Sequence, residues 1–293
     1  MKKLSFLIQI VVFCCLSLYI QAQSLSPQVV ASGGTVLTAG GYSLAYTVGE
    51  TATATLSSGS NILTQGFHQP DLQTLVKMLA KVFLQGAYNG FNMNTALQNP
   101  PSVFPLAQPY SGNPWNYNGA ENLLSVPANA VDWLFVELRD ASFNPVAGGK
   151  RAVLLLSDGT LRDVDGTAGA TFTGAVPGNY YIIVRHRNHL AVMSATQIGL
   201  PNALAYDFTT AAEQAFGPNQ QKALSGGVFG LYAGDFNTDG VITVADFNFF
   251  SANAALINVY NDADANLDKQ ITVADFNLYQ PNASTIGIQQ VRY

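Results

Sequence analysis

Most of this chain consists of short apolar and β-branched runs separated by turns rich in glycine, proline and aspartate. In the central part these runs predict seven strands, at residues 76–84, 131–138, 152–156, 170–172, 180–186, 190–194 and 205–208. Turn dipeptides such as Asp158-Gly159 and Pro177-Gly178 lie between them. Because no helical pattern alternates with these strands, the sequence favours an antiparallel β-sandwich over residues 72–210 and argues against folds built from βα units.

The N-terminal part carries a smaller group of strands behind an apolar leader. Lys2 and Lys3 precede an apolar run at 4–20, and Ala22 follows it, which is typical of a secretory signal peptide over residues 1–22. The alternatives are a membrane anchor and a lipoprotein signal that uses one of the two cysteines in this run. Residues 23–71 then predict a small β module with glycine- and serine-rich turns. Its strands are predicted at 28–31, 43–48, 51–56 and 62–65.

Helical periodicity becomes clear only near the C-terminus. Thr243 is a predicted N-cap, and the apolar residues after it, Val244, Phe247, Phe250 and Ala254, are spaced three or four residues apart. The stretch 226–234 before this helix is too rich in glycine to form a helix of its own. We therefore expect a connector at 211–231, two loop–helix units without entering helices at 232–281, and a tail at 282–293.

The loops of these two units are copies of one acidic pattern, at residues 235–246 and 264–275. Each copy places carboxylate or amide oxygens at loop positions 1, 3 and 5, a backbone carbonyl at position 7 and a closing carboxylate at position 12. Both continue into the same apolar sequence, which ordinary aspartate-rich turns do not share. The predicted metal ligands are Asp235, Asn237, Asp239, Val241 and Asp246 in the first loop, and Asp264, Asn266, Asp268, Gln270 and Asp275 in the second.

This spacing of hard oxygen ligands is that of a calcium loop, so we expect two Ca²⁺ sites. Seven of the 18 acidic residues of the chain lie between Asp235 and Asp275, and their repulsion favours a bound cation. Lys269 replaces the glycine normally found at loop position 6, so the second site is expected to be the weaker one. The alternative is a decayed pair that keeps the fold without binding the ion.

Two loop–helix units with these ligands and no entering helices resemble a type I dockerin domain, which is EF-hand-like. The resemblance implies two antiparallel helices held by Ca²⁺, with a helix face that binds a cohesin partner. The positions used for cohesin recognition are here Val244-Ala245 and Val273-Ala274, which departs from the family pattern and favours a face packed against the body of this chain.

Segments outside the loops resemble secreted surface proteins of Gram-negative bacteria that use type IX secretion. The first segment includes Tyr46-Thr-Val-Gly-Glu50 and residues 61–70, and the others are 131–139 and 178–190. This resemblance implies a secreted protein that is extracellular or lies on the outer-membrane surface, and it implies no particular chemistry.

Composition and charge narrow the function classes further. The 293 residues carry a net charge of −5, and only 11% of them are charged, which argues against nucleic acid or anionic membranes as partners. After the leader no stretch is long and apolar enough to span a bilayer. No catalytic triad motif, zinc motif or phosphate loop occurs, so we expect no enzyme.

Three other clusters have both a functional and a structural interpretation. The run Arg185-His-Arg-Asn-His189 is interpreted as a strand end and hairpin turn, with binding of an anionic sugar or general acid–base chemistry as the alternatives. The aromatic residues at 83–117 are interpreted as a cover for the core, with a sugar-binding platform as the alternative. Asp163-Val-Asp165 is interpreted as a hairpin turn, with a third cation site as the alternative.

Together these observations predict an exported, non-enzymatic, calcium-binding protein that acts in surface interactions. Its partner is expected to be a protein or a glycan at the cell surface. The runner-up is a carbohydrate-binding or glycan-degradation accessory protein.

Overall fold

A computed structural model describes residues 33–39, 42–48, 55–58, 61–64, 75–98 and 103–292 of the chain. The chain divides into two compact units, Met1–Leu72 and Gln73–Tyr293. The predicted signal peptide and the strand predicted at 28–31 lie outside the described residues. All segments predicted after residue 72 belong to the second unit.

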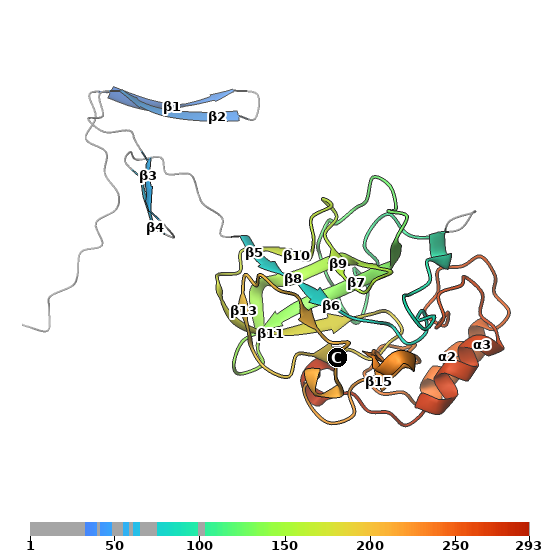
Figure 1. The fold of residues 1–293 in the computed structure, drawn as a ribbon. Helices are drawn as coiled ribbons and strands as arrows, with labels where there is room; N and C mark the ends of the chain where they lie inside the picture. Colours follow the sequence, from blue (N-terminus) through green and yellow to red (C-terminus); the bar gives the residue numbers. More distant parts are fainter. Residues whose placement is uncertain are drawn as a thin grey trace, which may run out of the picture. The chain divides into compact units, whose positions relative to one another are not determined.

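The first unit contains two antiparallel strand pairs (Figure 1). One pair joins β1 (Gly33–Ala39) to β2 (Tyr42–Val48), and the other joins β3 (Thr55–Ser58) to β4 (Asn61–Thr64). Strand β1 was not predicted, because its initial glycines indicated a turn and not the start of a strand.

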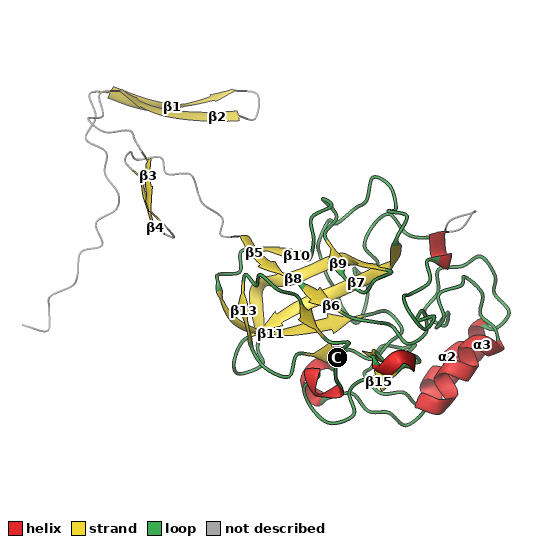
Figure 2. Cartoon of the chain, viewed as in Figure 1, coloured by secondary structure: helices red, strands yellow, loops and turns green. Residues whose placement is uncertain are grey.

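The second unit is built around one mixed-length antiparallel sheet with strand order β12–β11–β7–β8–β9, in which β13 also pairs with β11 (Figure 2). Shorter strand pairs accompany it: β5 with β10, β6 with β14 in parallel, and β15 with β16. The bounds are β5 Leu75–Met78, β6 Ala80–Lys81, β7 Ala130–Arg139, β8 Pro145–Leu156, β9 Leu161–Arg162, β10 Ala170–Thr173, β11 Gly178–Arg185, β12 Val192–Met193, β13 Ile198–Leu200, β14 Tyr206–Asp207, β15 Lys222–Ala223 and β16 Phe229–Gly230.

The described fold is thus mainly β, as predicted, with two α-helices near the C-terminus: α2 (Val244–Asn253) and α3 (Val273–Tyr279). A sandwich of two packed sheets stays a prediction. In the described part, no helix has the length and apolar character needed to cross a membrane.

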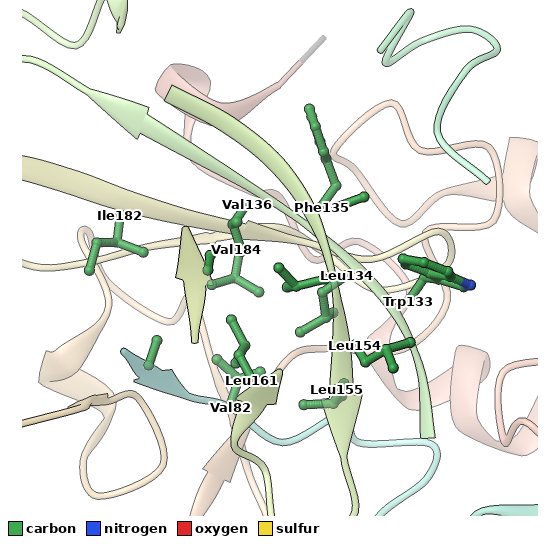
Figure 3. Packing of buried hydrophobic residues seen from close by; sticks show 14 of the residues in the cluster. Val82, Trp133, Leu134, Phe135, Val136, Leu154, Leu155, Leu161, Ile182 and Val184 are labelled. Atoms are coloured by element: carbon green, nitrogen blue, oxygen red, sulfur yellow. The ribbon is translucent and has the colours of Figure 1, made fainter. Parts of the chain in front are cut away.

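Strand β7 is the centre of the core because both of its faces are covered. Nine of its ten residues are buried, which fits its almost continuous apolar sequence. Trp133, Leu134 and Phe135 of β7 pack close to Leu154 and other aliphatic residues of the neighbouring strands (Figure 3). Burial of this sheet is the main apolar contribution to the stability of the unit.

Several predicted strands differ in length from the observed ones. The strand predicted at 76–84 is split at Leu79, whose backbone N–H donates to Asn202 Oδ1 (2.7 Å) and whose carbonyl accepts from Asn202 Nδ2 (2.8 Å). A side chain therefore replaces the ladder at this point. Strand β8 begins seven residues before the predicted start at 152, and the two- and three-residue strands β9 and β13 were not predicted.

The aromatic loop covers the core, as its structural interpretation predicted. Tyr110 donates its hydroxyl to the carbonyl of Trp133 (2.7 Å), stacks on Phe135 and meets Trp115 edge to face. Trp115 is only 8% exposed, whereas Phe91 is 82% exposed. The rings at 104–115 are therefore not available as a flat platform for a sugar.

Burial of the loop aromatics can be tested with a matched pair of substitutions. Trp115→Ala should lower the free energy of unfolding by about 3 kcal/mol or more, because it removes a large buried ring. Phe91→Ala should change it by less than about 0.5 kcal/mol, because that ring is exposed. Urea unfolding of both variants measures the difference, and equal effects would contradict the assignment of Trp115 to the core.

Candidate metal centre

The two acidic loops are each closed by the start of a helix. Thr243, the predicted N-cap of α2, accepts a hydrogen bond from Ala245 N–H, and Asp246 accepts one from Thr243 N–H in a capping box. Thr272 and Asp275 repeat this arrangement at α3. The predicted N-cap is confirmed, and the closing carboxylate of each loop is oriented by its own helix.

The backbone of the two loops turns in the same way. Loop positions 4 and 6 have positive φ in both copies: 58° at Thr238 and 83° at Gly240, then 61° at Leu267 and 73° at Lys269. Lys269 thus adopts the left-handed conformation that the sequence comparison expected at this position. A side chain costs on the order of 1 kcal/mol in that conformation.

In the first loop, backbone N–H groups turn the carboxylates toward the loop interior. Asp246 Oδ1 accepts from Phe236 N–H (2.8 Å) and Asn237 N–H (3.1 Å). Asp239 Oδ1 accepts from Val241 N–H (2.9 Å), and Asp235 accepts from the N–H at position 6 (3.2 Å). Asp235 and Asp246 are buried.

The second loop repeats this pattern. Asp275 Oδ1 accepts from Asn266 N–H (3.1 Å), and Asp268 Oδ1 accepts from Gln270 N–H (2.8 Å). Asp264 Oδ2 accepts from the N–H of the position-6 residue (2.8 Å). The structure thus brings the three carboxylates and the amide of each predicted ligand set into one tight turn, with closely similar hydrogen bonds in the two copies.

The carboxylates repel one another in this partly dry surrounding. Burial raises the pKa of Asp235 well above its usual value, and the charges of Asp246 and Asp239 raise it further. Burial likewise raises the pKa of Asp264 to about 7, although the guanidinium of Arg187 acts in the opposite direction. A cation in each loop would remove this repulsion.

The donor set fits a hard oxygen-seeking cation better than a soft one. Among the described residues, no group of three or more His, Cys, Asp and Glu side chains forms a metal cluster. That finding includes the three aspartates of each loop, so the case for calcium depends on the oxygen chemistry of the full ligand set, which adds an amide and a backbone carbonyl to the carboxylates. Asn237 and Asn266 donate their Nδ2 to Asp239 and Asp268 (2.9 Å each), and their Oδ1 accepts from the backbone N–H of the same two residues (3.1 Å each).

The loops lie against a buried polar cluster of the β body, by which we mean the strands of the second unit and the segments that connect them before Asp235. Arg187 Nε donates to Asp132 Oδ2 (2.9 Å), and its guanidinium lies 4.2 Å from the centre of the Tyr260 ring. Tyr260 donates its hydroxyl to Asp132 Oδ1 (2.6 Å). Burial alone would raise the pKa of Asp132, but Arg187 and His186 lower it to about 2. The basic run at 185–189 is therefore structural, as its first interpretation predicted.

The two histidines of this cluster are arranged as neutral rings. His189 Nε2 accepts from Gly86 N–H (3.2 Å), which leaves its Nδ1 protonated toward Asn188 Oδ1 (2.7 Å). His186 Nε2 then donates to Asp132 Oδ2 (3.1 Å). Burial lowers the pKa of both rings. A proton added to His189 would point at the N–H of Gly86.

The segment Asp163-Val-Asp165 is occupied by its own hydrogen bonds. Asp163 pairs with Arg151 (2.7 Å), and Asp165 accepts from the backbone and side chain of Thr167 (2.8 Å each). These contacts support the hairpin-turn interpretation.

The outer side of the two helices is apolar and open to solvent. A groove there is lined by Phe247, Phe250, Ile271, Val273 and Phe276, together with smaller residues. Val244 is 68% exposed and Val273 is 69% exposed. The expectation that these recognition positions pack against the body is wrong, because the body contacts the loops and not this face.

Acid should weaken the cluster around His189. Because the pKa values of His186 and His189 lie below 6.5 in the folded chain, the unfolded chain binds more protons as the pH falls through that value. The melting temperature in saturating calcium should therefore fall between about pH 7.5 and pH 5. His189→Gln should show a smaller fall, because it removes one of the two histidines, while the contribution of the carboxylates is common to both proteins. An equal fall would contradict this origin.

Comparisons with known proteins leave the family open. No protein-family model matches the chain, and no curated protein matches it. Two of the similar solved structures are interface mutants of a type II cohesin–X–dockerin complex from Acetivibrio cellulolyticus. One shares 14% identity over 53% of this chain and 82% of that chain, with a TM-score of 0.30. The other shares 16% identity over 56% and 91%, with a TM-score of 0.31. Likeness at this level carries no functional argument, so the function is argued from the site itself.

Proposed function

We propose that this chain is an exported, non-enzymatic interaction protein whose C-terminal loops bind two Ca²⁺. The observation that carries the proposal is the repetition, in two loops, of the same turn with the same carboxylates drawn together by backbone N–H groups. Buried like charges of this kind are costly unless a cation or protons neutralise them.

Calcium is the cation that best suits these groups. It takes six to eight oxygen ligands and tolerates irregular geometry, and each loop offers three carboxylates, one amide and one carbonyl. In the first loop these belong to Asp235, Asn237, Asp239, Val241 and Asp246. In the second they belong to Asp264, Asn266, Asp268, Gln270 and Asp275. Water would complete each coordination shell.

The interaction role is supported by the helix face that points away from the body. Val244 and Val273 are exposed beside a groove lined by apolar residues. Exposed apolar surface of this kind is typical of protein–protein interfaces. The resemblance of the loops to a dockerin supports the same role, with a protein as the partner. The sugar-binding alternative loses support because the rings of the aromatic loop are mostly buried.

Calcium uptake is the direct test of this proposal. Metal-stripped protein should take up two ions in calorimetry, and Asp246→Asn and Asp275→Asn should each impair one loop. Excess calcium should raise the melting temperature, since a ligand at about 100 times its dissociation constant contributes roughly 2.7 kcal/mol per site.

A matched control is Asp165→Asn, because this carboxylate lies in a hairpin turn. It should leave both ions and the calcium-induced rise unchanged. If metal-stripped wild-type protein takes up no calcium and melts at the same temperature in calcium and in EGTA, the proposed function is wrong.

A further inference from the structure

Asn188, in the segment that follows β11, contacts the first residues of both acidic loops. Its carbonyl accepts from Gly234 N–H (3.0 Å), directly before Asp235, the first position of the first loop. Its side-chain Nδ2 donates to the carbonyl of Asp264 (2.7 Å), the first position of the second loop. Asn188 is fully buried. One residue of the β body thus fixes the start of each loop.

Apolar contacts join the same elements. Leu190 donates its N–H to Tyr232 O (2.9 Å) and packs in a buried cluster with Phe236, Ala265 and Tyr279. Phe236 and Ala265 occupy position 2 of the first and second loop. The two loops therefore share one small core that the body completes through Leu190.

The second loop also lies against the segment after β6. An added Cβ on Gly86 would lie 1.8 Å from the carbonyl oxygen of Ala265, so only glycine permits this approach. Asn94 Nδ2 donates to Asn266 O (3.0 Å) nearby. The β body therefore contacts the backbone of the second loop directly. This is the loop that carries Lys269 and is expected to bind calcium more weakly.

Each loop is also hydrogen-bonded to the segment that follows the helix of the other unit. The segment after α3 bonds the first loop, through Ile242 N–H to Thr285 O (2.9 Å) and Ser284 N–H to Ile242 O (2.7 Å). The segment after α2 bonds the second loop in the same way, through Ala255 N–H to Ile271 O (2.8 Å) and Ile271 N–H to Leu256 O (2.9 Å). Each loop is therefore hydrogen-bonded to the segment that leaves the other unit.

We infer that Asn188 is a positioning residue that couples the two loops, so that two calcium ions bind cooperatively and in step with docking of the loops on the β body. This inference rests on the proposed function. The first ion orders its own loop and the segment after its own helix, which is bonded to the other loop. It also fixes the contact of its loop with Asn188. The second ion then binds a loop whose ordering cost is already met, which is positive cooperativity.

Calorimetric titration of the metal-stripped full chain with calcium tests the coupling. Wild-type protein should bind two ions with a Hill coefficient above about 1, with the number of sites as its limit. Asn188→Ala should still bind two ions, but about tenfold more weakly, with the coefficient near 1. Gly86→Ala should weaken the second loop in the same direction.

Two substitutions act as controls for these variants. Gly112→Ala adds a Cβ that meets no atom within 4 Å. Asn122→Ala removes an exposed amide that bonds only its neighbour's carbonyl in the described part of the chain. Both should titrate like wild type.

A further variant keeps the inference testable if Asn188→Ala does not fold. Asp246→Asn removes a predicted ligand of the first loop only, and coupling predicts that the ion in the second loop then binds at least about fivefold more weakly than the second ion of wild type. Two independent ions in wild type, or an unchanged second loop in Asp246→Asn, would overturn the inference and leave the proposed function intact. An absence of any calcium uptake by wild type would overturn the proposed function itself.

Discussion

Repulsion among buried carboxylates is the constraint on which the C-terminal part of this protein depends. Each loop draws three aspartates into one turn, and the backbone N–H groups that hold them offset only part of the cost of removing their charges from water. The helices do not remove this repulsion, because Asp246 and Asp275 serve as caps and as members of the acidic groups at once. Without an ion, the alternative is protonation, which the raised pKa of Asp264 makes accessible near neutral pH.

The β body supplies a positive charge, Arg187, that partly offsets the repulsion among the carboxylates of the second loop. Arg187 is buried, paired with Asp132 and stacked on Tyr260, and its field reaches Asp264. A buried ion pair adds little net stability compared with apolar packing, but it penalises every arrangement that separates its members. Here such separation would also remove Tyr260 from Asp132. The cluster therefore specifies where the second loop sits more than it strengthens the fold.

The sequence predicted the parts of the structure that depend on local pattern. The N-cap at Thr243, the buried strand at 131–138 and the two acidic turns each follow from residues within a dozen positions. The break at Leu79 was missed because it depends on Asn202, which lies 123 residues further along the chain. The role of Asn188 was missed for the same reason, since a polar residue at a strand end carries no local sign of distant partners. Calcium binding itself stays a prediction from the ligand pattern.

One expectation for the loop–helix units was wrong, namely that the recognition positions are buried against the β body. The body contacts the loops from the side of Gly86 and Asn188, where backbone atoms approach too closely for any larger residue at position 86. That contact covers the loops of the two loop–helix units, and the groove beside Val244 and Val273 stays open to solvent. Since the groove forms between α2 and α3, its shape depends on how the two loops hold those helices. An ion that orders the loops would therefore also set the geometry of the exposed groove, although the groove faces away from the β body.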